Sequence, residues 1–233
     1  MKSIQWGAMS TGLFLLAAGV ASAHAADTGW YFGVGVGGAN YPDSVPPQIA
    51  AAYQNNNTYT LTSARMIDSS DTAAQAFAGY RFLPWLGVEV GYQDLGKARS
   101  FYSLKTIGPI IYPRPTLTGE YGLSDVNAAL VLTWPINERF ELLARGGVSN
   151  TRLTYDENGL DVNAQPYSFH ARTRTRTGSM FGIGAAWNFA KHFSLRLDLD
   201  RSSDIGKKFA LNVEGNGRFD HVDAYTLNLV WRQ

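Results

Sequence analysis

Apolar and polar side chains alternate along most of this chain. The clearest stretch runs from Gln75 to Gly96 and contains two alternating segments joined by Leu83-Pro84-Trp85. In the second segment, a period of two puts Val88 and other apolar residues on one face and Glu89 with small or polar neighbours on the other. The stretch therefore predicts two antiparallel strands joined by a tight turn, with one apolar face.

The same alternation predicts eight strands in the whole chain. Short connections follow the second, fourth and sixth strands, whereas long polar segments follow the first, third, fifth and seventh. Tight turns at one end and long loops at the other are typical of a transmembrane barrel. The predicted strands lie at about 30–40, 75–82, 86–96, 119–134, 139–155, 175–189, 193–200 and 224–232.

The long polar segments are expected to be surface loops. Prolines support this assignment, because Pro109, Pro113 and Pro115 are unfavourable in a regular central strand. The expected loops are 41–70, 97–118, 156–174 and 203–219.

A cleaved signal peptide is expected at residues 1–25, which leaves residues 26–233 as a single barrel domain. Lys2 provides a positive start, an apolar segment follows, and cleavage after Ala23 or Ala25 fits the small-residue rule. The apolar segment is shorter than the ~20 residues of a spanning helix, which disfavours an uncleaved anchor. The sequence has no cysteine, so an exported protein would fold without disulfides.

Composition and charge then narrow the fold class. The formal net charge is +1 and the basic residues are scattered, so no nucleic-acid partner is expected. Beyond the signal peptide no apolar run approaches the length of a membrane helix, and only a closed barrel could then span a bilayer. A soluble sheet is the alternative. The alternating connections favour an all-β fold, an eight-stranded antiparallel up-and-down transmembrane β-barrel.

Aromatic side chains gather near the short-turn end of the predicted barrel. A soluble core would not explain this clustering, whereas amphipathic rings are common at the level of lipid headgroups. We therefore expect an interface girdle. It comprises Trp30, Tyr80, Phe82, Trp85, Trp134, Trp187, Phe189 and Trp231.

Four charged residues fall on the inward faces of their strands. An arginine that faces lipid near the midplane costs about 2–4 kcal/mol, so Arg145 and Arg196 should point inward. Buried charges need partners, which Glu89 and Asp198 would supply. Because side chains nearly fill an eight-stranded lumen, we expect an ion-pair cluster that plugs the barrel. A narrow gated pore is the alternative.

Several stretches resemble the transmembrane domain of the outer membrane protein A (OmpA) family. They are GWYFGVGVGG, QAFAGYRFLPWLGVEVGYQDLG, VLTWPINERFELLARGG and FGIGAAWNFAKHFSLRLDLDRSSDIG. The resemblance implies a bacterial cell outer membrane location, contact with outer-membrane lipid and lipopolysaccharide, and insertion by the barrel assembly machinery. Family members typically continue into a peptidoglycan-binding domain, whereas this sequence stops at Gln233. A stand-alone barrel without the anchoring role is therefore expected.

Three arginines could contact lipopolysaccharide. Arg172, Arg174 and Arg176 alternate with threonines at the start of the sixth predicted strand, and guanidinium groups pair well with phosphate. Strand phase instead points them to the mouth of the lumen. A solvated charged edge is the simpler alternative.

The sequence offers little support for catalysis or metal binding. The conceivable nucleophile system consists of His221 and Asp220 with Ser202 and Ser203, but such residues often occur together by chance in a polar segment. Acidic residues from Asp198 to Asp204 have arginine neighbours, which favours ion pairing over a calcium loop. We therefore expect no enzyme activity, no metal and no cofactor.

The expected function is structural: a barrel that supports envelope integrity and displays four long surface loops. Two alternatives remain open. One is a surface adhesin or receptor whose loops contact a host surface or a phage, and the other is a narrow gated pore through the charged lumen.

Overall fold

The structure is a computed structural model that describes residues 28–42, 59–106, 116–160, 165–170, 173–211 and 215–233. The expected signal peptide lies outside these residues. Among the residues described, no helix is long and apolar enough to cross a membrane. The strands are β1 Gly29–Asn40, β2 Tyr59–Asp68, β3 Ser70–Leu83, β4 Leu86–Thr106, β5 Thr116–Pro135, β6 Phe140–Leu160, β7 Pro166–His170, β8 Arg174–Ala190, β9 Phe193–Leu211 and β10 Gly215–Arg232.

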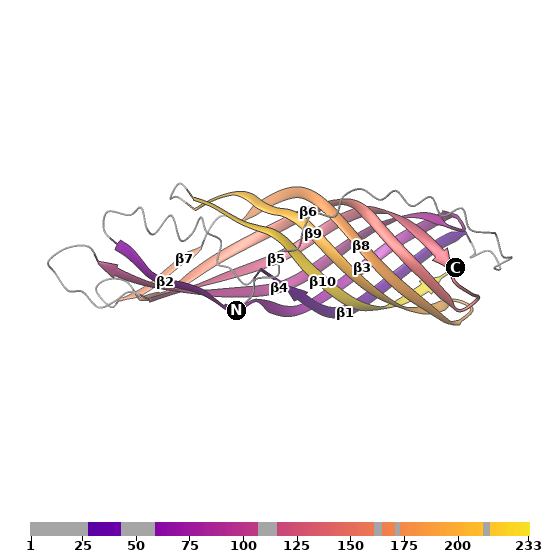
Figure 1. The fold of residues 1–233 in the computed structure, drawn as a ribbon, viewed down its shortest axis with the longest axis horizontal. Helices are drawn as coiled ribbons and strands as arrows, with labels where there is room; N and C mark the ends of the chain where they lie inside the picture. Colours follow the sequence, from indigo (N-terminus) through magenta and orange to yellow (C-terminus); the bar gives the residue numbers. More distant parts are fainter. Residues whose placement is uncertain (1–27, 43–58, 107–115, 161–164, 171–172, 212–214) are drawn as a thin grey trace, which may run out of the picture.

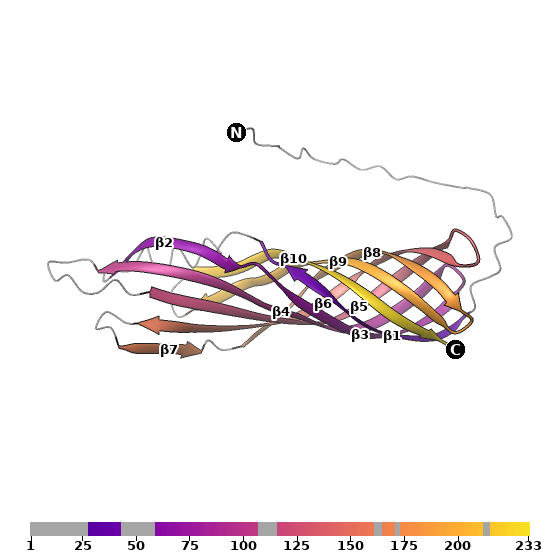
Figure 2. The same cartoon turned by 90° about the horizontal axis from the view of Figure 1, so that it is seen from below.

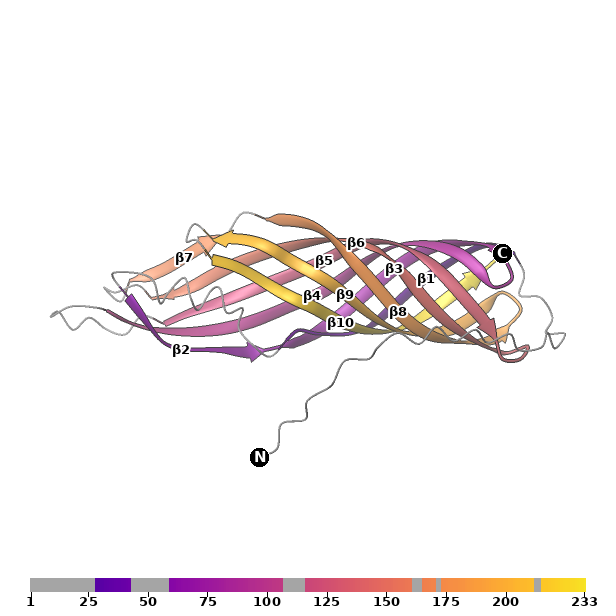
Figure 3. The same ribbon diagram turned by 45° about the horizontal axis from the view of Figure 1, so that its top comes forward.

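Eight of these strands form a closed antiparallel ring (Figures 1 and 3). The order is β4-β3-β1-β10-β9-β8-β6-β5, and β5 pairs again with β4. The remaining two strands continue existing ones, since β2 and β3 both pair with β4, and β7 and β8 both pair with β6. The predicted eight-stranded barrel is therefore confirmed.

Three short turns lie at the end of the barrel that also holds the C-terminus (Figure 1). They join β3 to β4, β5 to β6 and β8 to β9. In the second turn, Asn137 Oδ1 accepts hydrogen bonds from the backbone N–H groups of Arg139 and Phe140, both at 2.9 Å. Local side-chain bonding of this kind fixes a tight turn.

The four long segments were expected to be loops, and this is wrong for much of their length. β4 continues to Thr106 and β5 begins at Thr116, and the three prolines of this segment lie outside the described residues. β6 likewise continues to Leu160, β9 continues to Leu211, and β2 and β7 add further strand. Period-two burial persists over 97–106 and 150–160, where most outward positions are polar.

The part of the barrel near the short turns has an apolar outer surface, and we call it the membrane section. Outward side chains there are large and exposed, such as Leu130 at 57% and Trp134 at 53%. At ~3.3 Å per residue and a tilt of ~40°, the apolar band from Val126 to Trp134 is roughly 20 Å tall. The section comprises residues 30–38, 74–83, 86–94, 125–135, 140–149, 180–190, 193–200 and 224–232.

Beyond the membrane section, the strands continue into what we call the extension, residues 59–68, 97–106, 116–124, 150–160 and 166–170 (Figure 2). Most of its outward positions are polar, including Lys97, Arg99 and Glu120. Its inward positions form an apolar core, with Tyr121 and Leu123 both at 2% exposure. The sequence thus places apolar residues outside in one section and inside in the other.

A β-bulge in β4 lies at the junction of the two sections. The pairing with β5 shifts between Asp94 and Lys97, and Gly96 has a φ of 71°. Carboxylates hold the bulge, because Asp94 accepts the Gly96 N–H at 3.0 Å and Asp71 accepts the Lys97 N–H at 2.7 Å. The extra residue turns Lys97 outward, since a bulge changes the phase of the strand that follows.

Candidate functional site

The interior of the membrane section holds a buried network of charged side chains centred on Glu89. This carboxylate accepts Tyr31 Oη at 2.9 Å, Arg145 Nη1 at 3.1 Å and Arg196 Nη1 at 2.5 Å. β4, β1, β6 and β9 contribute these residues, so the contacts cross the lumen. Every partner is at most 7% exposed.

Two aspartates of β9 complete the charged network. Asp198 accepts Arg196 Nε at 2.9 Å and lies 3.4 Å from Arg145 Nη2. Asp200 pairs with the same Arg145 nitrogen. Three carboxylates, including Glu89, therefore surround two guanidinium groups.

Neutral amides link this network to the opposite wall. Gln93 donates to Gln75 Oε1 at 2.6 Å and to Asp200 Oδ2 at 3.3 Å. Gln75 in turn donates to Thr226 and Asn228 at 2.7 and 2.6 Å. The polar network therefore extends from β3 and β4 to β9 and β10.

Close packing around the charges uses one aromatic ring and two glycines. The Arg196 guanidinium lies 3.9 Å from the Phe77 ring centroid, a cation–π contact. A Cβ at Gly182 or Gly184 would lie 2.0 or 2.5 Å from an oxygen of Asp200 or Asp198, respectively. These glycines leave the room that the two carboxylates occupy.

The structure brings together all four residues that the sequence predicted for the lumen cluster, Glu89, Arg145, Arg196 and Asp198. Sequence reasoning missed Asp200 as a member, although it shares the inward phase of Asp198. It also missed the hydrogen bonds of the amide side chains. The alternation of a strand gives the direction of its side chains but not their height along the barrel axis, which decides which residues of other strands they meet.

A second buried cluster lies at the short-turn end. Glu141 accepts hydrogen bonds from both terminal guanidinium nitrogens of Arg81, at 3.5 and 3.1 Å, and from both of Arg232, at 3.1 and 2.9 Å. Asn188 Nδ2 also donates to Glu141 at 3.3 Å. The inward phases of Glu141 and Arg232 were readable from the sequence, but their meeting with Arg81 was not.

The aromatic residues of the expected girdle lie on the outer surface near the short turns. Their exposed fractions run from 38% for Tyr80 to 53% for Trp85 and Trp134. Several rings pack together, with Trp30 lying 5.1 Å from Tyr80 and Phe32 lying 5.9 Å from Trp231 between centroids. The ring contacts form two groups, one around Trp30 and one around Phe189, and the place of these rings at the headgroups stays a prediction.

The three arginines considered for lipopolysaccharide are described only in part. Arg172 lies outside the described residues, and only the backbone of Arg174 is described. Arg176 pairs in register with Thr151, whose side chain is buried inside the barrel, and its Nε is buried. This position agrees with the inward phase and does not favour contact with lipid phosphates from outside.

Of the described residues considered for catalysis, Ser202 and His221 lie on opposite faces of the sheet, whereas Ser203 pairs in register with His221. Ser202 points inward and lies 3.5 Å from Asp125 Oδ2, whereas His221 is half exposed and lies 4.0 Å from Asp223. The side chains of Asp204 and Asp220 are outside the described set. Within the described residues, no group of three or more potential ligand side chains is arranged to hold a metal ion.

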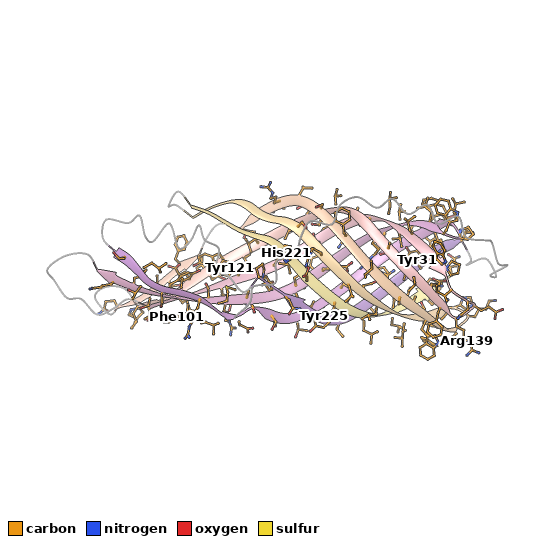
Figure 4. The ribbon with its side chains drawn as sticks, in the orientation of Figure 1. Tyr31, Phe101, Tyr121, Arg139, His221 and Tyr225 are labelled. Atoms are coloured by element: carbon orange, nitrogen blue, oxygen red, sulfur yellow. The ribbon has the colours of Figure 1, made fainter. Side chains whose placement is uncertain are left out.

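The extension has its own buried hydrogen bonds. Tyr102 and Tyr121 share a hydrogen bond at 2.7 Å, and Tyr155 donates to Glu157 at 2.6 Å. Burial raises the pKa of Tyr102 to about 12 and that of Tyr121 well above its ordinary value. These phenols therefore stay neutral and act as hydrogen-bonding members of the core. Figure 4 shows Tyr121 and Phe101 in the extension and Tyr31 at the opposite end.

Comparison with known proteins identifies the family. The OmpA-like transmembrane domain family matches residues 24–230. Outer membrane protein A of Serratia marcescens is 26% identical over 80% of this chain and 46% of its own length. That of Klebsiella pneumoniae is 24% identical over 77% of this chain and 45% of its own length. The chain thus spans about half the length of these curated relatives.

Solved barrels are similar in outline. Neisserial surface protein A has a TM-score of 0.48 and 12% identity, with 88% of this chain and 97% of that chain covered. The outer membrane protein OprG of Pseudomonas aeruginosa has a TM-score of 0.47 and 13% identity, with 88% and 98% covered. On the family match, the chain belongs to the OmpA-like transmembrane domain family and is a bacterial outer-membrane β-barrel.

Proposed function

We propose that this protein is a structural barrel of the outer membrane whose plugged lumen keeps the envelope sealed. The observation that carries the proposal is the Glu89 network, which joins opposite walls of the lumen through side chains at most 7% exposed. Paired and hydrogen-bonded charges of this kind are costly to separate. The short turns face the periplasm and the extension faces the cell exterior, as is usual for outer-membrane barrels.

Conductance tests the sealed lumen. Purified protein in planar bilayers should show no steady conductance, whereas Glu89→Ala should either leak or destabilise the barrel. A wild-type channel that Glu89→Ala or Arg196→Ala abolishes would instead support the narrow gated pore. In cells, loss of the protein should increase sensitivity to detergents and large antibiotics. Unchanged sensitivity would contradict the envelope role.

Surface recognition is a second candidate function, and the extension favours it. Outward charges there are carried on strands with a buried core, so a partner would meet a preformed surface rather than mobile loops. Neutralising Lys97, Arg99 and Glu120 together should then reduce adhesion or phage adsorption without changing barrel assembly. Unchanged adsorption and adhesion would contradict surface recognition by these residues and leave the structural role as the proposed function. Insertion through the barrel assembly machinery is part of the same proposal.

A further inference from the structure

The short-turn end of the barrel holds a polar cavity of about 490 Å³. Its floor contains Arg81, Glu141 and Arg232, and its rim is formed by the turns at 136–139 and 191–192. Figure 4 shows Tyr31 and Arg139 at this end of the barrel. The volume lies within the range of roughly 300–1,000 Å³ that is usual for small-molecule sites.

The floor of this cavity carries more positive than negative charge. Two guanidinium groups, Arg81 and Arg232, share the single carboxylate of Glu141, at 3.1 and 2.9 Å for the shorter contacts. The Arg81 and Glu141 side chains are 7% and 3% exposed, so water screens this excess only weakly. Arg232 is 23% exposed and lines the cavity.

The rim adds to the same charge. Arg139 and Lys191 line the cavity together with one further carboxylate, Glu138. Counted over the side chains of the lining, four cations face two carboxylates, with His192 neutral; the terminal carboxylate of Gln233, which also lines the cavity, reduces the excess to a net charge of +1. A concave site with one sign of charge concentrates ions of the opposite sign.

The central network does not cancel this excess at close range. It carries the opposite imbalance, with Glu89, Asp198 and Asp200 around Arg145 and Arg196. Each of these carboxylates already accepts a guanidinium donor from that network, and Tyr31, which lines the cavity, donates to Glu89. Because the carboxylates of the central network are already paired, they do not neutralise Arg81 and Arg232, whose positive charge faces the cavity.

We propose that this cavity, the periplasmic vestibule, binds an oxyanion, either the carboxylate of a small acidic peptide or a phosphate group. The Arg81–Glu141–Arg232 floor supplies the buried positive charge, and Arg139 and Lys191 draw the anion to the mouth. Guanidinium groups are well suited to both kinds of oxyanion. The site is separate from the central network and does not depend on whether the lumen conducts.

Amide chemical shifts of the refolded protein in micelles would test the proposal at low salt. The probes are inorganic phosphate and a capped Asp-Glu dipeptide, and the capped Asn-Gln dipeptide is the neutral control. Saturable shifts are expected at Asn188 and Arg232. Arg139→Gln with Lys191→Gln should weaken binding by roughly fivefold, in line with two exposed charges. Glu138→Gln should tighten it, and this rim change leaves the floor intact.

A matched double variant controls for net charge. Arg152→Gln with Lys105→Gln removes the same two charges from exposed positions of the extension and should leave affinity unchanged. A response to phosphate alone or to the dipeptide alone identifies which source supplies the oxyanion. No saturable shift with either probe overturns the proposal, and so does an equal loss of affinity in the two double variants.

Discussion

The membrane section and the extension are built on the same strands but place their side chains in opposite ways. On β5, Leu130 faces outward and Asn127 inward in the membrane section, whereas Glu120 faces outward and Tyr121 inward in the extension. The β5–β6 pairing passes through the junction without a register shift. The backbone is therefore continuous, and the side chains alone change with the surrounding solvent.

This difference shows which interactions stabilise each section. Moving apolar side chains from lipid into the barrel interior gives little free energy, because lipid is itself apolar. The membrane section is therefore specified by paired polar side chains in its lumen. In water, the extension gains from removing Tyr102, Tyr121, Leu123 and similar residues from solvent. One barrel thus uses ionic pairing for one half and hydrophobic burial for the other.

The largest expected effect comes from breaking the lumen network. Arg196→Ala leaves the three buried carboxylates Glu89, Asp198 and Asp200 with Arg145 as the one remaining guanidinium of the network, and should destabilise the folded barrel by about 3–5 kcal/mol. Urea unfolding in lipid vesicles, followed by gel mobility without boiling, measures the change. Arg201→Ala is the control, since Arg201 is 56% exposed and pairs with Asp223 on the outside. Equal effects of the two substitutions would contradict the claim that the buried lumen network stabilises the barrel.

A smaller effect is expected from an arginine placed on each outer surface. Leu130→Arg puts a charge near the middle of the apolar band and should cost about 2–4 kcal/mol, whereas Thr118→Arg in the extension should change stability by under ~0.5 kcal/mol. The fraction of folded protein after insertion into vesicles reports both. Similar costs at the two positions would move the membrane boundary away from the junction.

The junction itself can be tested at the bulge. Gly96→Ala places a Cβ 2.6 Å from Asp71 Oδ2 on a residue with φ of 71°, and should cost about 1–2 kcal/mol. Gly146→Ala is the matched control, because its Cβ would approach the Phe181 ring at an ordinary 3.7 Å. Thermal melting of both variants measures the difference, and an unaffected Gly96 variant would mean that the bulge is not strained.

The smallest effect is expected on the outer surface of the extension. Glu120→Gln removes the ion pairs with Lys97 and Arg99, which should contribute under ~1 kcal/mol. The hydrogen bond from Lys97 lowers the pKa of Glu120, with a further bond from Arg99. Because the pKa of Glu120 is lower in the folded state, its ionised carboxylate stabilises the fold at pH values above the unfolded pKa of ~4.3. This stabilisation is lost as the pH falls through the folded pKa. Melting the wild type and the variant from pH 7 to pH 3 should show their difference disappear.

The sequence predicted the membrane section well because lipid imposes a simple rule on it. Alternation placed Glu89, Arg145, Arg196 and Asp198 inside, and the aromatic residues outside near the short turns. It could not give the stagger between strands, on which the meeting of Gln75, Gln93 and Asp200 depends. The alternation predicts which side chains point inward, but it does not predict how far along the barrel axis each one lies.

The extension was predicted only in part, at 119–124 and 150–155, and the rest was taken for loops for a different reason. Most of its outward residues are charged or polar, which resembles a loop, and three prolines lie between β4 and β5 in the sequence. The inverted alternation was nevertheless present, with Leu117, Tyr121 and Leu123 on one face. Apolar outward faces are typical of strands that lie in lipid, whereas strands that lie in water carry their apolar face inside.

Hydrogen exchange of the barrel in lipid bilayers tests the central contrast most directly. If the extension is a folded continuation with its own apolar core, amides at 117–123 and 151–157 should be protected for minutes or longer, although more weakly than those at 126–132. Exchange of the 117–123 and 151–157 amides at the rate of an unstructured chain would contradict the account and reduce the protein to a short barrel with four mobile loops.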